Sequence, residues 1–261
     1  KVKTGIAHPF LRPAMALLDP LLTESMSPQI TASTGMDVLT HALESYTSLP
    51  FDKRKKPDHP SMRAAYIGSN ILSDIFCVKA IEIVGQYLRR AVADPHDLEA
   101  RWHMMVGSTL AGIGFGNAGV HIPHSMAYPI GGMVHDYRPL GYKVEEAMIP
   151  HGQAVTITAP AAFRFTAPAW PEKHAHAAQL LGLNTKDMSV EKAAMALSDE
   201  VIELMKEIGF PNGLSEMGFT EADVPQIVDG TLKQQRLLVG CPRQVGEKEL
   251  TQIAKESMRY W

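Results

Sequence analysis

An unbroken helical period constrains this chain more than any other feature of its sequence. Apolar residues recur every three or four positions through most of the 261 residues, and Pro, Gly and Asn separate the periodic stretches. The one alternation of β-branched residues, Val155 to Thr158, lies inside a longer helical pattern. The sequence therefore predicts a mainly α, multi-helix fold of about ten helices, without a sheet.

Local signals place the predicted helices. Ser27 and Pro28 suit the N-cap and the first position of a helix. The period predicts helices over residues 34–46, 62–92, 98–113, 147–165, 173–181, 189–208, 221–231 and 247–260. Residues 133–149 lack the period, so we expect a loop there.

Composition excludes several classes of partner. The hydrophobic content of 45% is ordinary for a globular core, and residues 1–261 are expected to form one helical domain. The net charge of −3 provides no surface for nucleic acid or an anionic membrane. The basic run Lys53 to Lys56 lies between two prolines and is expected to be a solvated loop. No apolar stretch approaches the roughly 20 residues that a membrane-spanning helix needs.

The two cysteines indicate a reducing compartment. Cys77 and Cys241 cannot build a disulfide framework, and neither belongs to a C-x-x-C pair. No signal peptide opens the chain, which begins at Lys1 rather than at Met. We expect a cytoplasmic protein, with the mitochondrial matrix as the alternative if the source is eukaryotic.

Among the 11 histidines, spacing distinguishes candidate metal ligands from the rest. Asp37 and His41 stand four residues apart on a predicted helix, which puts the carboxylate and the imidazole on one face. His121 and His124 lie beside small residues, and His151 follows Pro150 at a predicted helix start. A carboxylate with several neutral imidazoles suits Zn²⁺ or Fe²⁺.

The remaining histidines are expected to be structural or solvated. His103 lies in an apolar helix, where a core histidine with satisfied hydrogen bonds is the expectation. The others fall in predicted loops or on polar faces, where surface imidazoles are expected: His8, His59, His96, His174 and His176.

Two further motifs match known signatures in the wrong context. Residues 114–119 fit G-x-G-x-x-G, but a helical run precedes them where a dinucleotide-binding turn needs a strand. Their glycines are expected to let helices or substrate approach closely. His135-Asp136 is similar to the HD dyad of all-α metal-dependent phosphohydrolases, but it lies in a predicted loop rather than on a helix.

Several blocks together resemble one enzyme family. Residues 34–44 read TGMDVLTHALE, similar to the G-x-D-x-x-x-H-A-x-E signature of iron-containing (group III) alcohol dehydrogenases. Residues 124–131 (HSMAYPIG) resemble the family's H-G-M-A-H-P-x-G block, and residues 150–152 its P-H-G. Residues 241–243 (CPR) resemble its N-P-R, with Asn replaced by Cys. The likeness follows the chain in order over essentially its whole length.

Shorter matches resemble the hydroxyacid–oxoacid transhydrogenase branch of that family. They comprise residues 43–47, 98–101 and 112–120, and the long stretch between the last two histidine blocks fits as well. The resemblance predicts the helical, metal-binding C-terminal domain of the iron-dependent alcohol dehydrogenase and dehydroquinate synthase-like fold. The family's N-terminal α/β nucleotide-binding domain is expected to be absent from residues 1–261.

The resemblance also assigns residues to roles. It makes His121 a neighbour of the site rather than a ligand. Tyr128 stands where many family members have a proton-relaying histidine, which makes it a catalytic candidate with a different proton route. The metal ligands that the resemblance implies are Asp37, His41, His124 and His151.

The implied chemistry is metal-assisted hydride transfer. A divalent metal, Fe²⁺ with Zn²⁺ as the alternative, lowers the pKa of an alcohol, which then gives hydride to a nicotinamide. The protein is expected to be an NAD(P)-dependent oxidoreductase that interconverts an alcohol, in particular a short hydroxy acid, and its aldehyde or ketone. NAD(P) is expected to bind through the missing domain, so residues 1–261 alone are expected to be inactive. The full-length protein is expected to be a homo-oligomer.

A second class of function stays open. The chain could be a stand-alone all-α metal-dependent hydrolase or a metal-binding module. A strand-rich segment with a Gly-rich phosphate loop before Lys1 favours the oxidoreductase, whereas phosphatase activity of this chain alone favours the hydrolase.

The loop at residues 133–149 contains a candidate for substrate binding. It lies between two expected ligands, so it must pass near the metal. Arg138 in this loop could pair with a substrate carboxylate through two parallel hydrogen bonds. Asp136, Glu145 and Glu146 weaken the positive charge, and an arginine that only solvates the loop is the alternative. We therefore predict a hydroxy acid or oxo acid as substrate, with Arg138 as the partner of its carboxylate.

Overall fold

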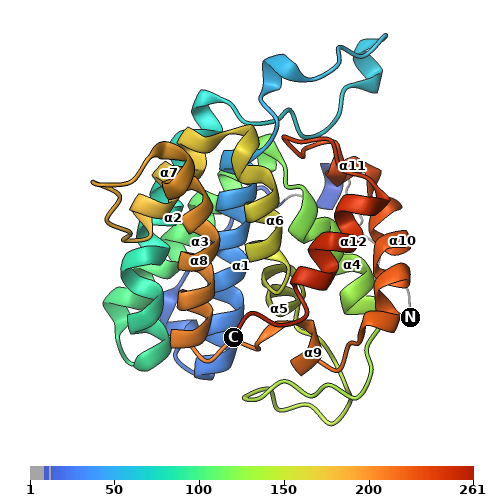
Figure 1. Ribbon diagram of the computed structural model, residues 1–261. Helices are drawn as coiled ribbons and strands as arrows, with labels where there is room; N and C mark the ends of the chain where they lie inside the picture. Colours follow the sequence, from blue (N-terminus) through green and yellow to red (C-terminus); the bar gives the residue numbers. More distant parts are fainter. Residues whose placement is uncertain (1–8, 12) are drawn as a thin grey trace.

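The predicted helical fold is confirmed in the computed structural model, which describes residues 9–11 and 13–261 (Figure 1). Within these residues the only strand-like pairing is one isolated parallel bridge between Pro50 and Ser69. The helices form two neighbouring groups, and α1 (Pro28–Thr47) runs through the larger one. In the described part of the chain, no helix is both long and apolar enough to cross a membrane.

The helices follow one another with short connections, except around residues 48–70 and 133–150. After α1 come α2 (Ile71–Ala93), α3 (Leu98–Ala118), α4 (Ile122–Gly132), α5 (His151–Thr156), α6 (Ala159–Thr166), α7 (Pro171–Leu180), α8 (Val190–Glu207), α9 (Gly213–Glu216), α10 (Val224–Leu232), α11 (Gln235–Leu238) and α12 (Glu247–Glu256). The predicted loop at residues 133–149 is therefore confirmed to within one residue.

Side-chain caps start the three longest helices. The Ser27 hydroxyl accepts a hydrogen bond from the Ile30 N–H at 3.2 Å, with Pro28 in the first turn, as predicted. Asn70 and Asp97 cap α2 and α3 in the same way. At the other end of α3, Gly119 has φ of +87°, a conformation that a glycine adopts without strain. This turn directs the chain into α4.

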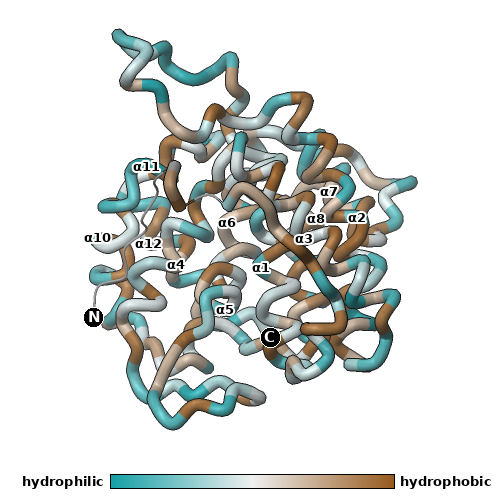
Figure 2. The backbone as a smooth tube through the Cα atoms, turned by 180° about the vertical axis from the view of Figure 1, so that it is seen from behind, coloured by the Kyte–Doolittle hydropathy of each residue, from teal (hydrophilic) through white to brown (hydrophobic). Residues whose placement is uncertain are grey.

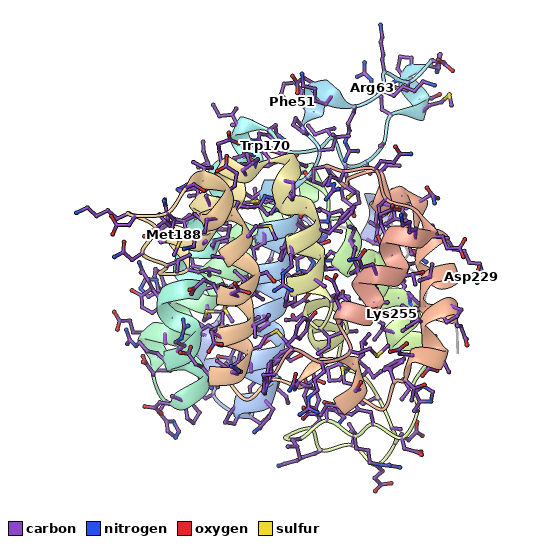
Figure 3. The ribbon with its side chains drawn as sticks, in the orientation of Figure 1. Phe51, Arg63, Trp170, Met188, Asp229 and Lys255 are labelled. Carbon is purple, nitrogen blue, oxygen red and sulfur yellow. The ribbon has the colours of Figure 1, made fainter. Side chains whose placement is uncertain are left out.

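Several predicted helices have different bounds in the structure. The helix expected to start at Ser27 and Pro28 and the separate helix expected over residues 34–46 are one helix, α1. The helix expected over residues 62–92 begins at Ile71, because residues 51–69 form an excursion that projects from the helical body (Figures 1 and 3). Phe51 and Arg63 lie on this excursion in Figure 3. The helix expected over residues 147–165 is two helices, α5 and α6. Pro160 near the start of α6 has no N–H and would clash with the carbonyl four residues earlier, which favours a break in the helix at this point.

Apolar faces of both helix groups meet around α1. α1 packs on α2, α3 and α5, while α6, α7 and α8 extend this layer, and α4 packs on α10. Leu39, Leu43, Met126 and Phe163 are among the fully buried side chains of the shared core. In contrast, Asp229 of α10 and Lys255 of α12 lie on the outer faces of their helices (Figure 3). The chain thus follows the amphipathic pattern that its period predicts.

An apolar segment before α1 crosses the back of the molecule. Residues 13–22, here called the N-terminal strap, run over α3 and α1 in Figure 2. Met15, Leu17 and Leu22 in the strap are 84%, 92% and 78% exposed. Figure 2 shows this run as hydrophobic although it lies at the surface.

The histidine predictions are partly right. His59 and His96 are exposed, as expected, and the half-buried His103 ring stacks on Tyr87 at 3.9 Å between centroids. His8 lies outside the described residues.

The surface prediction is wrong for His174, which is fully buried. Its ring donates to the Trp170 carbonyl and pairs with the Thr166 hydroxyl at 2.9 Å. Burial lowers its pKa to about 4, so the ring stays neutral. The half-buried His176 pairs with the Tyr46 hydroxyl at 2.8 Å. Both histidines lie on α7. Because histidine is polar, the hydrophobic pattern gave no sign that these two positions face the protein interior.

Candidate metal centre

One face of α1 contains three polar side chains directed into the protein. Asp37, His41 and Glu44 are spaced i, i+4 and i+7, so they line the same side of the helix. Asp37 and His41 are partly buried, whereas Glu44 is fully buried. A buried charge is costly unless it has partners, so this face requires complementary groups from elsewhere in the fold.

α4 supplies His124 to this face. The Asp37 Oδ1 atom lies 3.4 Å from Nδ1 of His41 and 3.6 Å from Nε2 of His124. The rings of His41 and His124 have centroids 4.1 Å apart. One ligand atom from each of the three residues falls within 4.8 Å of the others. A single cation can therefore contact all three side chains.

Two atoms of this cluster have no hydrogen-bond partner although they are buried. They are Oδ1 of Asp37 and Nε2 of His124, and they face each other. Leaving such groups unpaired costs about 1–3 kcal/mol each, more for charged ones. A divalent cation between them would satisfy both, and a carboxylate with imidazoles is a donor set that suits Zn²⁺ or Fe²⁺. The residues present fit a metal.

Hydrogen bonds on the far side of each ring orient the two histidines. His41 donates from Nδ1 to the Asp37 carbonyl at 2.8 Å, which leaves its Nε2 for a metal. His124 donates from Nδ1 to Glu44 and presents Nε2 to Asp37. Such outer partners fix the tautomer and orientation of metal-binding histidines.

Glu44 is the functional residue whose role the sequence reasoning missed. Its Oε1 accepts the backbone N–H of His121 at 2.7 Å and that of His124 at 3.3 Å, while Oε2 accepts from the His124 ring. One carboxylate thus holds both the start of α4 and the ligand ring. Two signals were available: its place as the final Glu of the G-x-D-x-x-x-H-A-x-E signature, and its i+7 position after Asp37 on a face otherwise rich in apolar residues.

The charges in the site shift several pKa values. Burial opposes the negative charge of Asp37, but contact with His124 and the charges of three histidines lower its pKa to about 2. Burial and the neighbouring His124 lower the pKa of His41 to about 4. Burial also disfavours a charged His124, yet Glu44 and Asp37 raise its pKa to about 9. The two carboxylates therefore stabilise positive charge at this point, which is the charge a divalent cation brings.

His151 lies beside the three-residue cluster. It is the first residue of α5, and its ring centroid is 5.6 Å from that of His124. It does not join the group of atoms within 4.8 Å, and its side chain is exposed. Its place as the fourth ligand stays a prediction.

Gly152 sets how closely α5 approaches α1. A Cβ on Gly152 would overlap the Ser33 carbonyl oxygen and lie 2.7 Å from the carbonyl carbon. Because the obstacle is backbone, Gly152→Ala is expected to push the two helices apart, cost about 1–3 kcal/mol and displace His151. Urea unfolding and metal titration would measure both effects.

Gly116→Ala is the matched control for this change. Gly116 also lies in a helix, but a Cβ there meets nothing within 4 Å. The control is expected to gain up to about 1 kcal/mol from helix propensity. Wild-type stability and wild-type metal affinity in Gly152→Ala would show that the close approach is not needed.

The other predicted site residues are distributed around this centre. His121 is fully buried, and its Nε2 lies 3.4 Å from the Thr47 hydroxyl. Tyr128 lies one turn after His124 on α4, and its hydroxyl accepts a hydrogen bond from Arg236 at 2.6 Å. Arg138 is exposed and donates to the carbonyls of Glu145 and Asp136 in its own loop, both at 3.2 Å.

Neither of the two motifs in a wrong context has the structural setting that its signature requires. Residues 114–119 lie in the last turns of α3 and its C-cap, so no strand precedes the glycines. Gly114 instead lets α3 approach Cys77 of α2, as the sequence predicted for these glycines. His135 lies in the loop, 3.4 Å from Asp223, and its neighbour Asp136 is exposed.

A cavity opens beside the metal centre. It has a volume of about 660 Å³ and lies between the N-terminal strap, α1 and α3. Asp37 and His41 line one end, and Phe115 and Met104 contribute apolar walls. A small organic molecule in this cavity would therefore reach the metal-binding side chains.

Comparisons with known proteins agree with this geometry. Residues 65–258 match the model of the Fe-containing alcohol dehydrogenase family, C-terminal part. The chain is 44% identical over 264 residues to the human (Homo sapiens) protein named hydroxyacid-oxoacid transhydrogenase, mitochondrial. It is 41% identical over 258 residues to the probable hydroxyacid-oxoacid transhydrogenase of Dictyostelium discoideum. The alignments cover 100% and 98% of this chain, but 56% and 47% of the relatives, so the chain spans about half their length.

Solved structures show the same helical domain. A 1,3-propanediol oxidoreductase aligns with a TM-score of 0.77 at 32% identity, over 92% of this chain and 54% of that one. An alcohol dehydrogenase from Oenococcus oeni aligns with a TM-score of 0.76 at 28% identity, over the same 92% and 54%. These similarities extend over nearly all the described helices. The chain therefore belongs to the iron-containing alcohol dehydrogenase family, whose C-terminal helical domain it forms.

Proposed function

We propose that this protein is a nicotinamide-dependent oxidoreductase that interconverts a short hydroxy acid and the corresponding oxo compound at a divalent metal. The observation that carries the proposal is the convergence of two unpartnered buried atoms, Asp37 Oδ1 and His124 Nε2, beside His41. The family and the names of the relatives support the reaction class and the acid substrate. The same family and names favour an oxidoreductase over the hydrolase alternative.

The residues of this chain have distinct roles in the proposal. Asp37, His41, His124 and His151 hold the cation, with Glu44 orienting His124. The cation, Fe²⁺ with Zn²⁺ as the alternative, supplies Lewis acidity that lowers the pKa of the substrate hydroxyl. In this proposal Tyr128, one helical turn from His124, exchanges a proton with bound substrate. NAD(P) binds through the α/β domain of the family.

The buried free thiols agree with the proposed cellular environment. Cys77 and Cys241 are unpaired, and burial raises the pKa of each to about 12. The cytoplasm and the mitochondrial matrix both keep thiols reduced. The mitochondrial location in the names of the relatives supports the matrix.

Turnover by the metal-loaded full-length protein tests this function. The protein, loaded with Fe²⁺ under anaerobic conditions or with Zn²⁺, is expected to oxidise 4-hydroxybutyrate with formation of reduced nicotinamide. Chelation should abolish turnover, and readdition of metal should restore it. Stoichiometric metal without turnover of any hydroxy acid or alcohol would refute the proposal, and metal-dependent phosphate release would favour the hydrolase.

A further inference from the structure

An arginine outside the predicted site residues lies next to the metal-binding helix. Arg236 of α11 donates from its guanidinium to the Tyr128 hydroxyl at 2.6 Å, and its Cζ lies 5.7 Å from the centroid of the Tyr128 ring. α11 packs on α4, and the two helices lie on the same side of the molecule in Figures 1 and 2. Arg236 is exposed and Tyr128 is half-buried, so the pair borders solvent.

The spacing on α4 relates this pair to the metal centre. Tyr128 and His124 are four residues apart, so their side chains leave the same face of the helix. One helical turn, about 5.4 Å along the axis, separates them. Arg236 therefore adds a positive charge at the side chain that lies one turn along α4 from His124.

The described arginines differ in their hydrogen-bond partners. Five of them donate to backbone carbonyls: Arg54, Arg101, Arg138, Arg243 and Arg259. Arg89, Arg90 and Arg164 form ion pairs with carboxylates. Among the described residues no carboxylate lies within ion-pair distance of Arg236, whose one hydrogen bond to them goes to a neutral tyrosine. A guanidinium has five N–H donors in a planar fork that matches a carboxylate.

We propose that Arg236, held by Tyr128, binds the carboxylate of the substrate and is the residue that selects hydroxy acids over neutral alcohols. This inference rests on the proposed function, because it identifies the acid-binding group of that site. It also replaces Arg138 as the favoured carboxylate partner. Arg138 already donates to two carbonyls of its own loop, whereas Arg236 borders the helix that supplies His124.

The test compares two substrates that share a four-carbon chain and differ in the carboxylate. In the full-length, metal-loaded protein, Arg236→Gln is expected to lower kcat/KM for 4-hydroxybutyrate at least about tenfold, mainly through KM, since a charged hydrogen bond is lost from binding. The value for 1-butanol should fall less, and through kcat rather than KM, because the variant also removes a hydrogen bond from the Tyr128 hydroxyl. Arg236→Lys keeps the charge but not the fork, so an intermediate loss is expected.

Four companion measurements make the result specific. Arg63→Gln changes an exposed arginine on the distant excursion (Figure 3) and should leave both substrates unaffected. Arg138→Gln tests the competing residue. Titration with butyrate, a carboxylate without a hydroxyl, should show binding to the wild type that Arg236→Gln weakens, and circular dichroism should show that all variants fold alike.

The outcomes separate the two proposals. Equal losses on both substrates in Arg236→Gln, or a selective loss only in Arg138→Gln, would overturn the role of Arg236 while the proposed function stands. A metal-loaded wild type that oxidises neither substrate would overturn the proposed function. In that case the butyrate titration alone decides whether Arg236 binds a carboxylate. Unchanged butyrate affinity in Arg236→Gln would reject the carboxylate-binding role of Arg236.

Discussion

His124→Ala is expected to abolish stoichiometric metal binding. His124 connects both sides of the centre, since its Nε2 faces Asp37 and its Nδ1 donates to Glu44. Removing the imidazole deletes one ligand and also leaves the buried Glu44 carboxylate without its ring partner. We expect metal content to fall from about one per chain to near zero after dialysis, as measured by elemental analysis.

The same substitution should also lower stability. Breaking a buried charged pair by removing one partner costs about 3–5 kcal/mol, so His124→Ala needs a folding check by circular dichroism. If the alanine variant does not fold, His124→Asn replaces it in the metal measurement, because asparagine keeps a smaller polar side chain at this position. His59→Ala, at an exposed histidine of the excursion, is the matched control and should retain full metal content. Full metal occupancy in a folded His124 variant would show that the assigned ligand set is wrong.

Glu44→Gln is expected to weaken metal binding although Glu44 touches no metal. An amide accepts at one atom only, whereas the carboxylate accepts three hydrogen bonds through two oxygens. The amide nitrogen would therefore face a backbone N–H or the His124 ring N–H. Both groups are donors, so no hydrogen bond can form between them. Loss of such an outer partner typically reduces metal affinity about 10- to 100-fold, and the unsatisfied donor costs about 1–3 kcal/mol.

Calorimetric metal titration and thermal unfolding of the metal-free protein measure these two effects separately. Glu203→Gln is the matched control, because Glu203 is exposed and pairs with Lys206 only at the surface. It should leave both quantities nearly unchanged. A Glu44→Gln variant with wild-type affinity would mean that the ring of His124 is oriented by its packing alone.

Local sequence rules succeeded where the structure is itself local. The caps at Ser27 and Pro28, the end of α8 near Ile208 and the loop after α4 all depend on residues close in sequence. Those rules failed at α5 and α6, where a single proline overrides a continuous apolar period. They also failed at His174, because helical period alone does not show which polar residue faces the core.

The sequence by itself determined the helical class and the first half of the metal centre. Asp37 and His41 share a face because four residues make about one turn of any α-helix. Only the tertiary structure decided the remainder. His124 meets Glu44 across 80 residues of chain, and Arg236 meets Tyr128 across 108. Such contacts depend on how α1, α4 and α11 pack, and packing is set by the summed burial of apolar faces rather than by any local spacing.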